Sequence, residues 1–192
     1  MQPLLDAHAQ PETLFTAALF PAGSWYPHDM ERAVDLLDRA TAMDPAYYDA
    51  HYVKALVLDD LARPDAASAA FDACVALRPY DPQLLRTVGC HRAVHGDSTG
   101  SKVLFQQAAT LLTGRSLAAD SHSWEDHRDL GTVLVLLGER EQGLHMMDRA
   151  FANAPTRPAR DHVDHLRALP ADLLVHALLP DRSAVVQHYQ QR

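Results

Sequence analysis

The sequence contains very little cysteine, only Cys74 and Cys90 in 192 residues. The two do not form a CxxC motif, and each falls within a stretch whose apolar residues recur at helical spacing. Free cysteine is one of the most frequently buried residue types. We therefore expect two reduced thiols packed in a core, as is usual in a reducing compartment, and no disulfide bridge.

The N-terminal region also lacks a long apolar run. Asp6 and Glu12 interrupt it early, whereas a secretory signal or a membrane span needs an uninterrupted apolar stretch. The sequence therefore predicts a cytoplasmic protein with no membrane partner.

An excess of basic residues is missing too. The chain carries 25 acidic and 17 basic side chains, which gives a formal net charge of −8. No segment is basic enough to displace many counterions from a phosphate backbone, so we expect no nucleic-acid partner.

Common motifs of catalysis and nucleotide binding are absent. The sequence has no GxSxG, no Walker loop and no GxGxxG. Cys90 and His91 are adjacent, so on a helix their side chains point in different directions and do not form a nucleophile pair. We therefore expect a protein that is not an enzyme and that uses no cofactor.

Histidine, in contrast, is frequent, with 12 residues. His91 and His95 are four apart, which places both rings on one helix face, and His162 and His165 form a second cluster with two neighbouring aspartates. Either pair could bind zinc. Neither matches a known metal motif, since residues 91–95 read HRAVH rather than HEXXH, so we expect no bound metal. A metal-handling or enzymatic protein that uses these clusters is the alternative.

What the sequence does contain is an internal repeat. A small residue, a large apolar residue, a second small residue and a helix-ending residue occur in this order four times, at steps of 34, 34 and 42 residues. The four sets are Ala33/Leu37/Ala40/Pro45, Ala67/Phe71/Cys74/Pro79, Ser101/Phe105/Ala108/Thr113 and Gly143/Met147/Ala150/Pro155. Ala55, Gly89 and Gly131 form a second series with steps of 34 and 42. Two series with the same steps indicate a repeated structural unit.

Each repeat is predicted to consist of two helices. Apolar residues recur at helical spacing between chain breakers such as Asp81-Pro82, where a capping residue precedes a first-turn proline. Ser123 and Asp126 form a capping-box pattern at the start of a later helix. Asp65 is expected to cap another. No stretch alternates with the two-residue period of a strand, so the sequence predicts an all-α protein.

A 34-residue period made of two helices resembles the tetratricopeptide repeat (TPR) family, over about Tyr48 to Arg157. The resemblance implies a right-handed superhelix of antiparallel helix pairs with capping helices at both ends. We expect one helical repeat domain over residues 1–192. Its parts are a divergent first repeat (1–47), three TPR-like repeats (48–81, 82–115 and 124–157), an inserted loop (116–123) and one or two C-terminal capping helices (158–192).

In the TPR family the first helices of the repeats line a concave groove that binds a protein or peptide. The register implied by the resemblance places in this groove Asp49, Tyr52, Leu56, Gln83, Arg86, Cys90, Glu125, Arg128 and Thr132. Tyr52, Arg86 and Arg128 hold equivalent positions in three repeats. Arginine offers a fork of donors that matches a carboxylate, so one expected ligand carries an acidic group.

A second interpretation is that the two arginines pair with Glu125 and Asp129 and only keep the surface soluble. The sequence does not choose between these interpretations. The resemblance implies a non-catalytic adaptor or scaffold, and a bacterial secretion chaperone is a narrower alternative based on size. Such a chaperone would have an apolar groove, and Arg86 and Arg128 argue against it. Neither the identity of the partner nor an oligomeric state follows from these residues.

Overall fold

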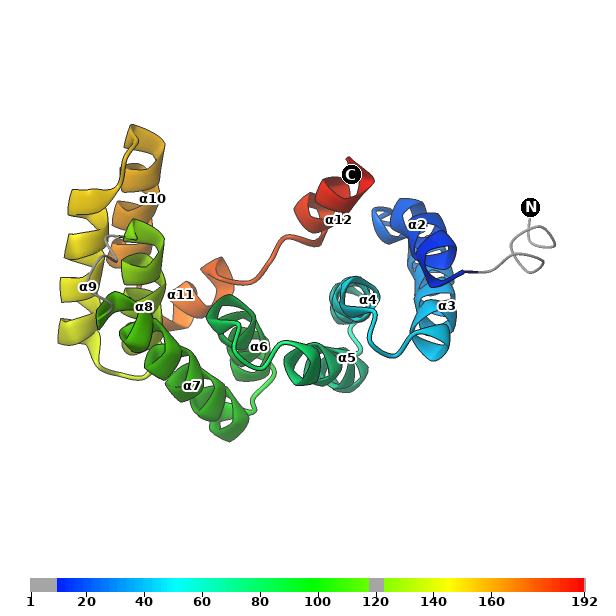
Figure 1. Ribbon diagram of the computed structural model, residues 1–192, viewed down its shortest axis with the longest axis horizontal. Helices are drawn as coiled ribbons and strands as arrows, with labels where there is room; N and C mark the ends of the chain where they lie inside the picture. Colours follow the sequence, from blue (N-terminus) through cyan, green and yellow to red (C-terminus); the bar gives the residue numbers. More distant parts are fainter. Residues whose placement is uncertain (1–9, 118–122, 192) are drawn as a thin grey trace. The chain divides into compact units, whose positions relative to one another are not determined.

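The computed structural model describes residues 10–117 and 123–191, and these residues contain helices and no strand (Figure 1). The all-α prediction is therefore confirmed. The helices are α2 (Pro11–Ala22), α3 (Pro27–Met43), α4 (Tyr48–Asp60), α5 (Pro64–Leu77), α6 (Pro82–Val94), α7 (Ser98–Leu117), α8 (Trp124–Leu136), α9 (Arg140–Asn153), α10 (Arg157–Ala168), α11 (Ala171–Ala177) and α12 (Arg182–Gln190). None of them is long and apolar enough to cross a membrane.

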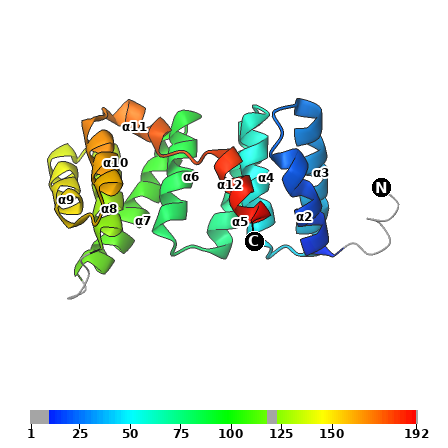
Figure 2. The same ribbon diagram turned by 90° about the horizontal axis from the view of Figure 1, so that it is seen from above.

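The helices form two compact units. The N-terminal unit contains α2 to α5 and, from much later in the chain, α12; its described residues are 10–78 and 180–191. The central unit contains α6 to α11, within residues 79–179. The pairs α2/α3, α4/α5, α6/α7 and α8/α9 each pack against one another over most of their length (Figures 1 and 2). Within each unit, the second helix of one pair also packs on the first helix of the next.

The core of the N-terminal unit is formed by the apolar faces of its first three helices. Leu14, Leu37 and Val53 are fully buried in it, one from each of α2, α3 and α4. Proline sets the start of several helices, because its fixed φ suits the first helical position. The prediction that Asp65 caps α5 is wrong. The helix begins at Pro64, and Asp65 lies inside the first turn, where its charge favours the helix dipole.

Small residues lie where paired helices approach most closely, as the repeat predicts. Ala55 and Ala67 are fully buried in the pair α4/α5, and Ser101 is buried in α7. A Cβ at Gly89 of α6 would come within 2.5 Å of the Phe105 ring on α7. The small residue of the first helix therefore leaves the space that the large residue of the second helix fills.

Two predicted caps in the central unit are confirmed. The Asp81 carboxylate accepts hydrogen bonds from the backbone N–H groups of Gln83 and Leu84, and the Ser123 hydroxyl accepts one from Asp126. Such bonds satisfy donors that the first turn of a helix otherwise leaves unpaired.

Helix α7 is longer than the sequence predicts. It passes through Thr113, the helix-ending residue of the repeat, and through Gly114, and it reaches Leu117. A glycine inside a helix costs about 1 kcal/mol relative to alanine, but it does not end the helix while its φ stays negative, as it does at Gly114. Residues 118–122 of the expected inserted loop lie outside the described residues.

After α9 the chain forms three helices instead of the one or two that we expected. The breaks fall at Pro170 and Pro180, because proline cannot donate the backbone hydrogen bond that continues a helix. In the central unit, α10 packs on α9, and α11 packs on α6 and α8, which buries Val163, Leu166 and Leu174. Helix α12 belongs to the N-terminal unit, where it lies against α2 and α4 (Figure 2).

Both cysteines are free and buried, as expected. Burial raises the pKa of the Cys74 thiol to about 12, and the positive charge of Arg78 opposes this effect. Burial likewise raises the pKa of Cys90 to about 12, against the opposing effect of Arg86. A buried thiol with so high a pKa is a poor nucleophile at neutral pH, because the reactive species is the thiolate.

Candidate partner-binding site

A buried carboxylate organises the first-helix face of the central unit. Asp129 of α8 is only 1 % exposed. Its Oδ1 accepts hydrogen bonds from Arg86 Nη1 at 3.3 Å and from Nε and Nη2 of Arg128 at 2.9 and 2.8 Å. Its Oδ2 accepts one from the Gln83 amide at 3.0 Å. Three of the predicted groove residues, from α6 and α8, therefore meet at one carboxylate that the prediction had not placed in the groove.

This cluster has more positive than negative charge. Two guanidinium groups share the single charge of Asp129, so the three side chains together carry one net positive charge. The side chains of Arg86 and Arg128 are only 13 % and 19 % exposed, and the Arg128 guanidinium also lies 5.1 Å from the centre of the Trp124 ring. Their positions are therefore fixed by packing as well as by charge.

The positive field extends to α10. The pKa of His162 is lowered, first by partial burial and then by the charges of Arg128, His165 and Arg86, while Asp129 opposes the shift. Among the described residues, Arg86 Nε is buried and has no hydrogen-bond partner. A buried donor without an acceptor costs free energy, so this atom lowers the stability of the cluster.

The other groove candidates of the central unit differ in accessibility. Thr132 is fully buried and donates its hydroxyl to the backbone carbonyl of Asp129 at 2.8 Å, and Cys90 is also fully buried. Glu125 is exposed and accepts a hydrogen bond from the Ser123 hydroxyl at 3.2 Å. The pairing of the arginines with Asp129 that the sequence suggested is present.

In the N-terminal unit, the predicted groove residues lie on α4. Tyr52 stacks on Tyr48 with ring centroids 5.8 Å apart, and the Arg78 guanidinium lies 3.5 Å from the centre of the Tyr48 ring. Leu56 is buried. Asp49 accepts a hydrogen bond from the Tyr189 hydroxyl of α12 at 2.8 Å. The Asp49 position is therefore already occupied by a side chain of the same protein.

Helix α12 also contributes to the first-helix face of the N-terminal unit, which the repeat pattern does not predict. Its Arg182 is buried and donates to the Asp60 carboxylate and to the backbone carbonyls of Ala22 and Ser24. Arg182, Val186 and Tyr189 are spaced by four and three residues, so they lie on one helix face. That spacing is a signal in the sequence, but nothing in it says which surface the face covers.

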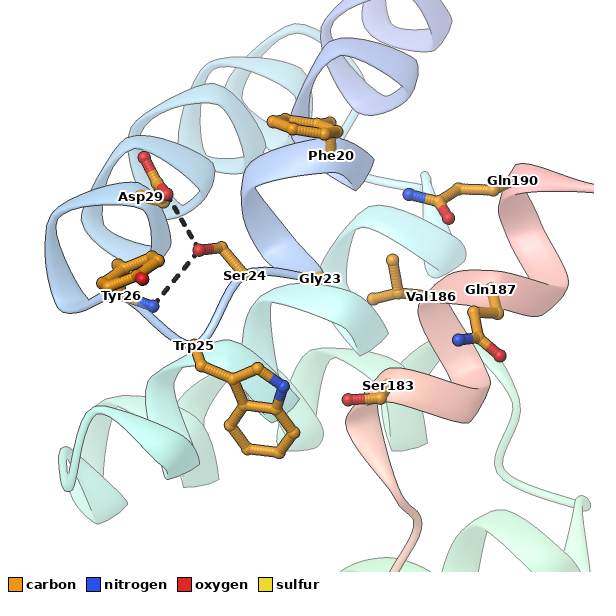
Figure 3. A pocket seen from close by; sticks show the side chains of 10 residues that line it. All are labelled: Phe20, Gly23, Ser24, Trp25, Tyr26, Asp29, Ser183, Val186, Gln187 and Gln190. Atoms are coloured by element: carbon orange, nitrogen blue, oxygen red, sulfur yellow. Dashed lines mark hydrogen bonds between the residues drawn. The ribbon is translucent and has the colours of Figure 1, made fainter.

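A cavity of about 490 Å³ lies between α12 and the connection from α2 to α3 (Figure 3). It is lined by Phe20, Trp25 and Tyr26 on one side and by residues of α12 on the other. These three aromatic side chains are 81 %, 73 % and 74 % exposed. Ser24 donates to Asp29 at 2.8 Å and shapes the connection.

The histidine clusters lie at the end of α6 and on α10, both in the central unit. His91 of α6 and His95, which directly follows the helix, have ring centroids 4.6 Å apart, and His91 is buried. His162 and His165 are on the exposed side of α10. That neither pair binds a metal stays a prediction, and metal binding is the alternative. Metal analysis of protein purified without a histidine tag would check it.

No family profile and no curated protein matches this sequence. Among solved structures, the chain is similar to a MamA RS-1 ArsTM double mutant, with 20 % identity over 79 % of this chain and 80 % of that chain and a TM-score of 0.56. It is also similar to MamA, with 13 % identity, coverage of 85 % and 90 %, and a TM-score of 0.47. A third similar structure is the TPR protein YrrB, with 17 % identity over 72 % of this chain and 84 % of that chain and a TM-score of 0.39.

These likenesses concern the fold. The first of them, together with helix pairs that follow the repeat steps of 34, 34 and 42 residues, establishes an all-α, TPR-like fold. The other two, with TM-scores below 0.5, add nothing to that conclusion.

Proposed function

We propose that this protein is a non-catalytic adaptor of the cytoplasm, which binds a partner protein or peptide through the first-helix faces of its repeats. The observation that carries the proposal is the cluster of Arg86, Arg128 and Asp129, which keeps one net positive charge at fixed positions. A carboxylate or another acidic group of the partner is the ligand that suits it.

Preorganisation supports this choice of ligand. A surface arginine normally loses side-chain entropy when it binds a carboxylate. Arg86 and Arg128 are already held by Asp129, and Arg128 also by Trp124, so less entropy is lost on binding. The amide of Gln83 fixes the other carboxylate oxygen, which keeps Asp129 from turning away from the arginines.

Site-specific photocrosslinking tests the proposal. A photoreactive phenylalanine analogue is placed either at Glu125, on the first helix α8, or at Arg149, on the second helix α9; both positions are exposed. In the source cell we expect one protein adduct from position 125 and none from position 149. The adduct should decrease with Arg128→Gln and, in a lysate of these cells, with rising salt, because salt screens the attraction between the positive cluster and an approaching acidic partner.

Two results would contradict the proposal. An adduct at position 149 alone would place the partner on the second-helix face. An adduct at position 125 that is insensitive to both salt and Arg128→Gln would mean that the arginine cluster takes no part in binding.

A further inference from the structure

Helix α12 is held on the N-terminal unit like a bound peptide. It comes from beyond the whole central unit in the chain, yet it packs against α2 and α4, the first helices of two successive pairs. First helices form the ligand face that we propose above. On the N-terminal unit, a helix of the same chain already lies against this face (Figures 2 and 3).

We propose that the face of α2 and α4 is a docking surface for a short cationic helix, that α12 is its internal occupant, and that a partner helix with an arginine and a tyrosine on one face replaces α12. This rests on the proposed function only in that first-helix faces bind ligands. It concerns the N-terminal unit and a cationic ligand, whereas the proposed function concerns the central unit and an acidic ligand.

Three side chains hold α12 on the N-terminal unit, and each contacts a group that matches it in charge, shape or hydrogen bonding. Arg182, at the start of α12, binds the Asp60 carboxylate and backbone carbonyls at the end of α2. Val186, one turn later, is buried beside Gly23, where a Cβ would be only 3.4 Å from its methyl group (Figure 3). Tyr189, near the end, donates to Asp49 at 2.8 Å.

The charges and apolar groups of the surface define the partner. Asp60 and Asp49 lie at the two ends of α4, and α12 spans them with Arg182 and Tyr189. Between them lies an apolar surface that includes Phe15, whose ring meets Tyr189 edge-on with centroids 5.3 Å apart. A competing helix needs a cation for Asp60, an apolar residue one turn later and a hydroxyl donor for Asp49.

The contact of α12 is small enough to be displaced. Only Arg182 and Val186 of its nine residues are buried. Among the described residues, Arg182 Nη2 and the Ser183 hydroxyl are buried without a hydrogen-bond partner. Buried polar groups that are left unsatisfied weaken an interface, so a helix that makes the same contacts without burying such groups binds more tightly than α12 does. The covalent link to the rest of the chain offsets this weak contact, because it gives α12 a high effective concentration at the surface.

The test uses the full chain and a synthetic peptide of residues 180–192 with a fluorescent label. Val186→Glu in the chain places a charge at the buried contact and releases α12. Binding measured by fluorescence anisotropy should then be at least about tenfold tighter than to the wild type, because an occupied face reduces the apparent affinity. Gln187→Glu, an equal change of charge at an exposed position of α12, is the matched control and should bind as weakly as the wild type.

A second measurement needs no variant of α12. In the ¹⁵N-labelled wild-type chain, an excess of unlabelled peptide should move the amide signals of residues 182–190 to the positions of a released segment. The same peptide with Arg182→Glu should leave them unchanged. Asp49→Ala in the chain should weaken the peptide's binding to the Val186→Glu background.

The proposal fails if the Val186→Glu chain keeps its melting transition but binds the peptide no better than the wild type. It also fails if millimolar peptide leaves the signals of residues 182–190 in place. A dimer in which each copy's α12 lies on the other copy would contradict the proposal that α12 occupies the face of its own chain. None of these experiments alters Arg86 or Arg128, so their failure leaves the proposed function of the central unit standing.

Discussion

Gly131 of α8 and Gly143 of α9 lie against each other with no room for a side chain on either. A Cβ at Gly131 would come within 2.8 Å of the Gly143 carbonyl oxygen, and a Cβ at Gly143 within 2.7 Å of the Gly131 carbonyl oxygen. The obstacle in each case is the backbone of the partner helix, which cannot move aside as a flexible side chain can. Both glycines belong to the small-residue series of the repeat.

We therefore predict that Gly143→Ala destabilises the protein by about 1–3 kcal/mol, the usual cost of overpacking. Urea unfolding followed by circular dichroism measures it. Gly114→Ala is the matched control, since Gly114 is also helical and a Cβ there would meet nothing within 4 Å. The control should be neutral or stabilising, because alanine is the better helix former. Equal losses in the two variants would contradict the predicted helix crossing.

Removal of the charge at Asp129 should strongly destabilise the folded protein. Asp129→Asn leaves Arg86 and Arg128 without their shared carboxylate, and breaking a buried ion pair from one side typically costs about 3–5 kcal/mol. Chemical unfolding of the variant checks this. Glu125→Gln, on the same helix but exposed, should change stability by less than about 0.5 kcal/mol. If Asp129→Asn is as mild as the control, the cluster contributes little to the fold.

The hydroxyl of Tyr189 should make the seating of α12 sensitive to alkaline pH. Burial, followed by the hydrogen bond to Asp49 and its charge, raises the pKa of Tyr189 above its usual value. A raised pKa in the folded state means that the stabilisation is complete below the unfolded pKa of about 10. It is then lost as the pH rises through the folded value.

Tyr189→Phe removes this dependence. The difference in unfolding free energy between wild type and Tyr189→Phe should be constant from pH 7 to about 10 and shrink at higher pH. A difference that grows with pH in the alkaline range would mean that the hydroxyl is not held as a donor to Asp49.

The cysteines should resist alkylation in the folded protein. Their pKa values are raised to about 12 by burial, so almost no thiolate exists at neutral pH. Iodoacetamide at pH 7.5 should label Cys74 and Cys90 only after denaturation, as mass spectrometry of digested protein would report. Rapid labelling of Cys90 in the native state would show that α6 opens or that the thiol is activated.

The sequence predicted those parts of the molecule that depend on neighbouring residues. The helix start at Asp81 follows from one side chain and the two N–H groups beyond it. The small residues at Gly89 and Gly131 follow from the repeat, because each repeat solves the same packing problem. Neither required knowledge of distant contacts.

Contacts between distant segments could not be predicted from the sequence. Tyr189 and Asp49 are 140 residues apart, and α12 lacks the repeat spacing that would assign it to a surface.

At the arginine cluster, the sequence suggests Arg86→Glu with Arg128→Glu as a binding test that leaves the fold intact. The structure shows that this double change would bring three carboxylates together around Asp129, so the milder Arg128→Gln is the better variant.

The seating of α12 also has a consequence for biosynthesis. A ribosome releases α2 to α5 first, and the residues 79–179 of the central unit must follow before α12 is made. At the usual rate of about 5–20 residues per second, that interval lasts about 5–20 s. During it, Asp49 and Asp60 of the nascent chain face solvent without Tyr189 and Arg182. Under the docking proposal, the order of translation therefore gives a partner helix near the ribosome access to the face of α2 and α4 before α12 exists.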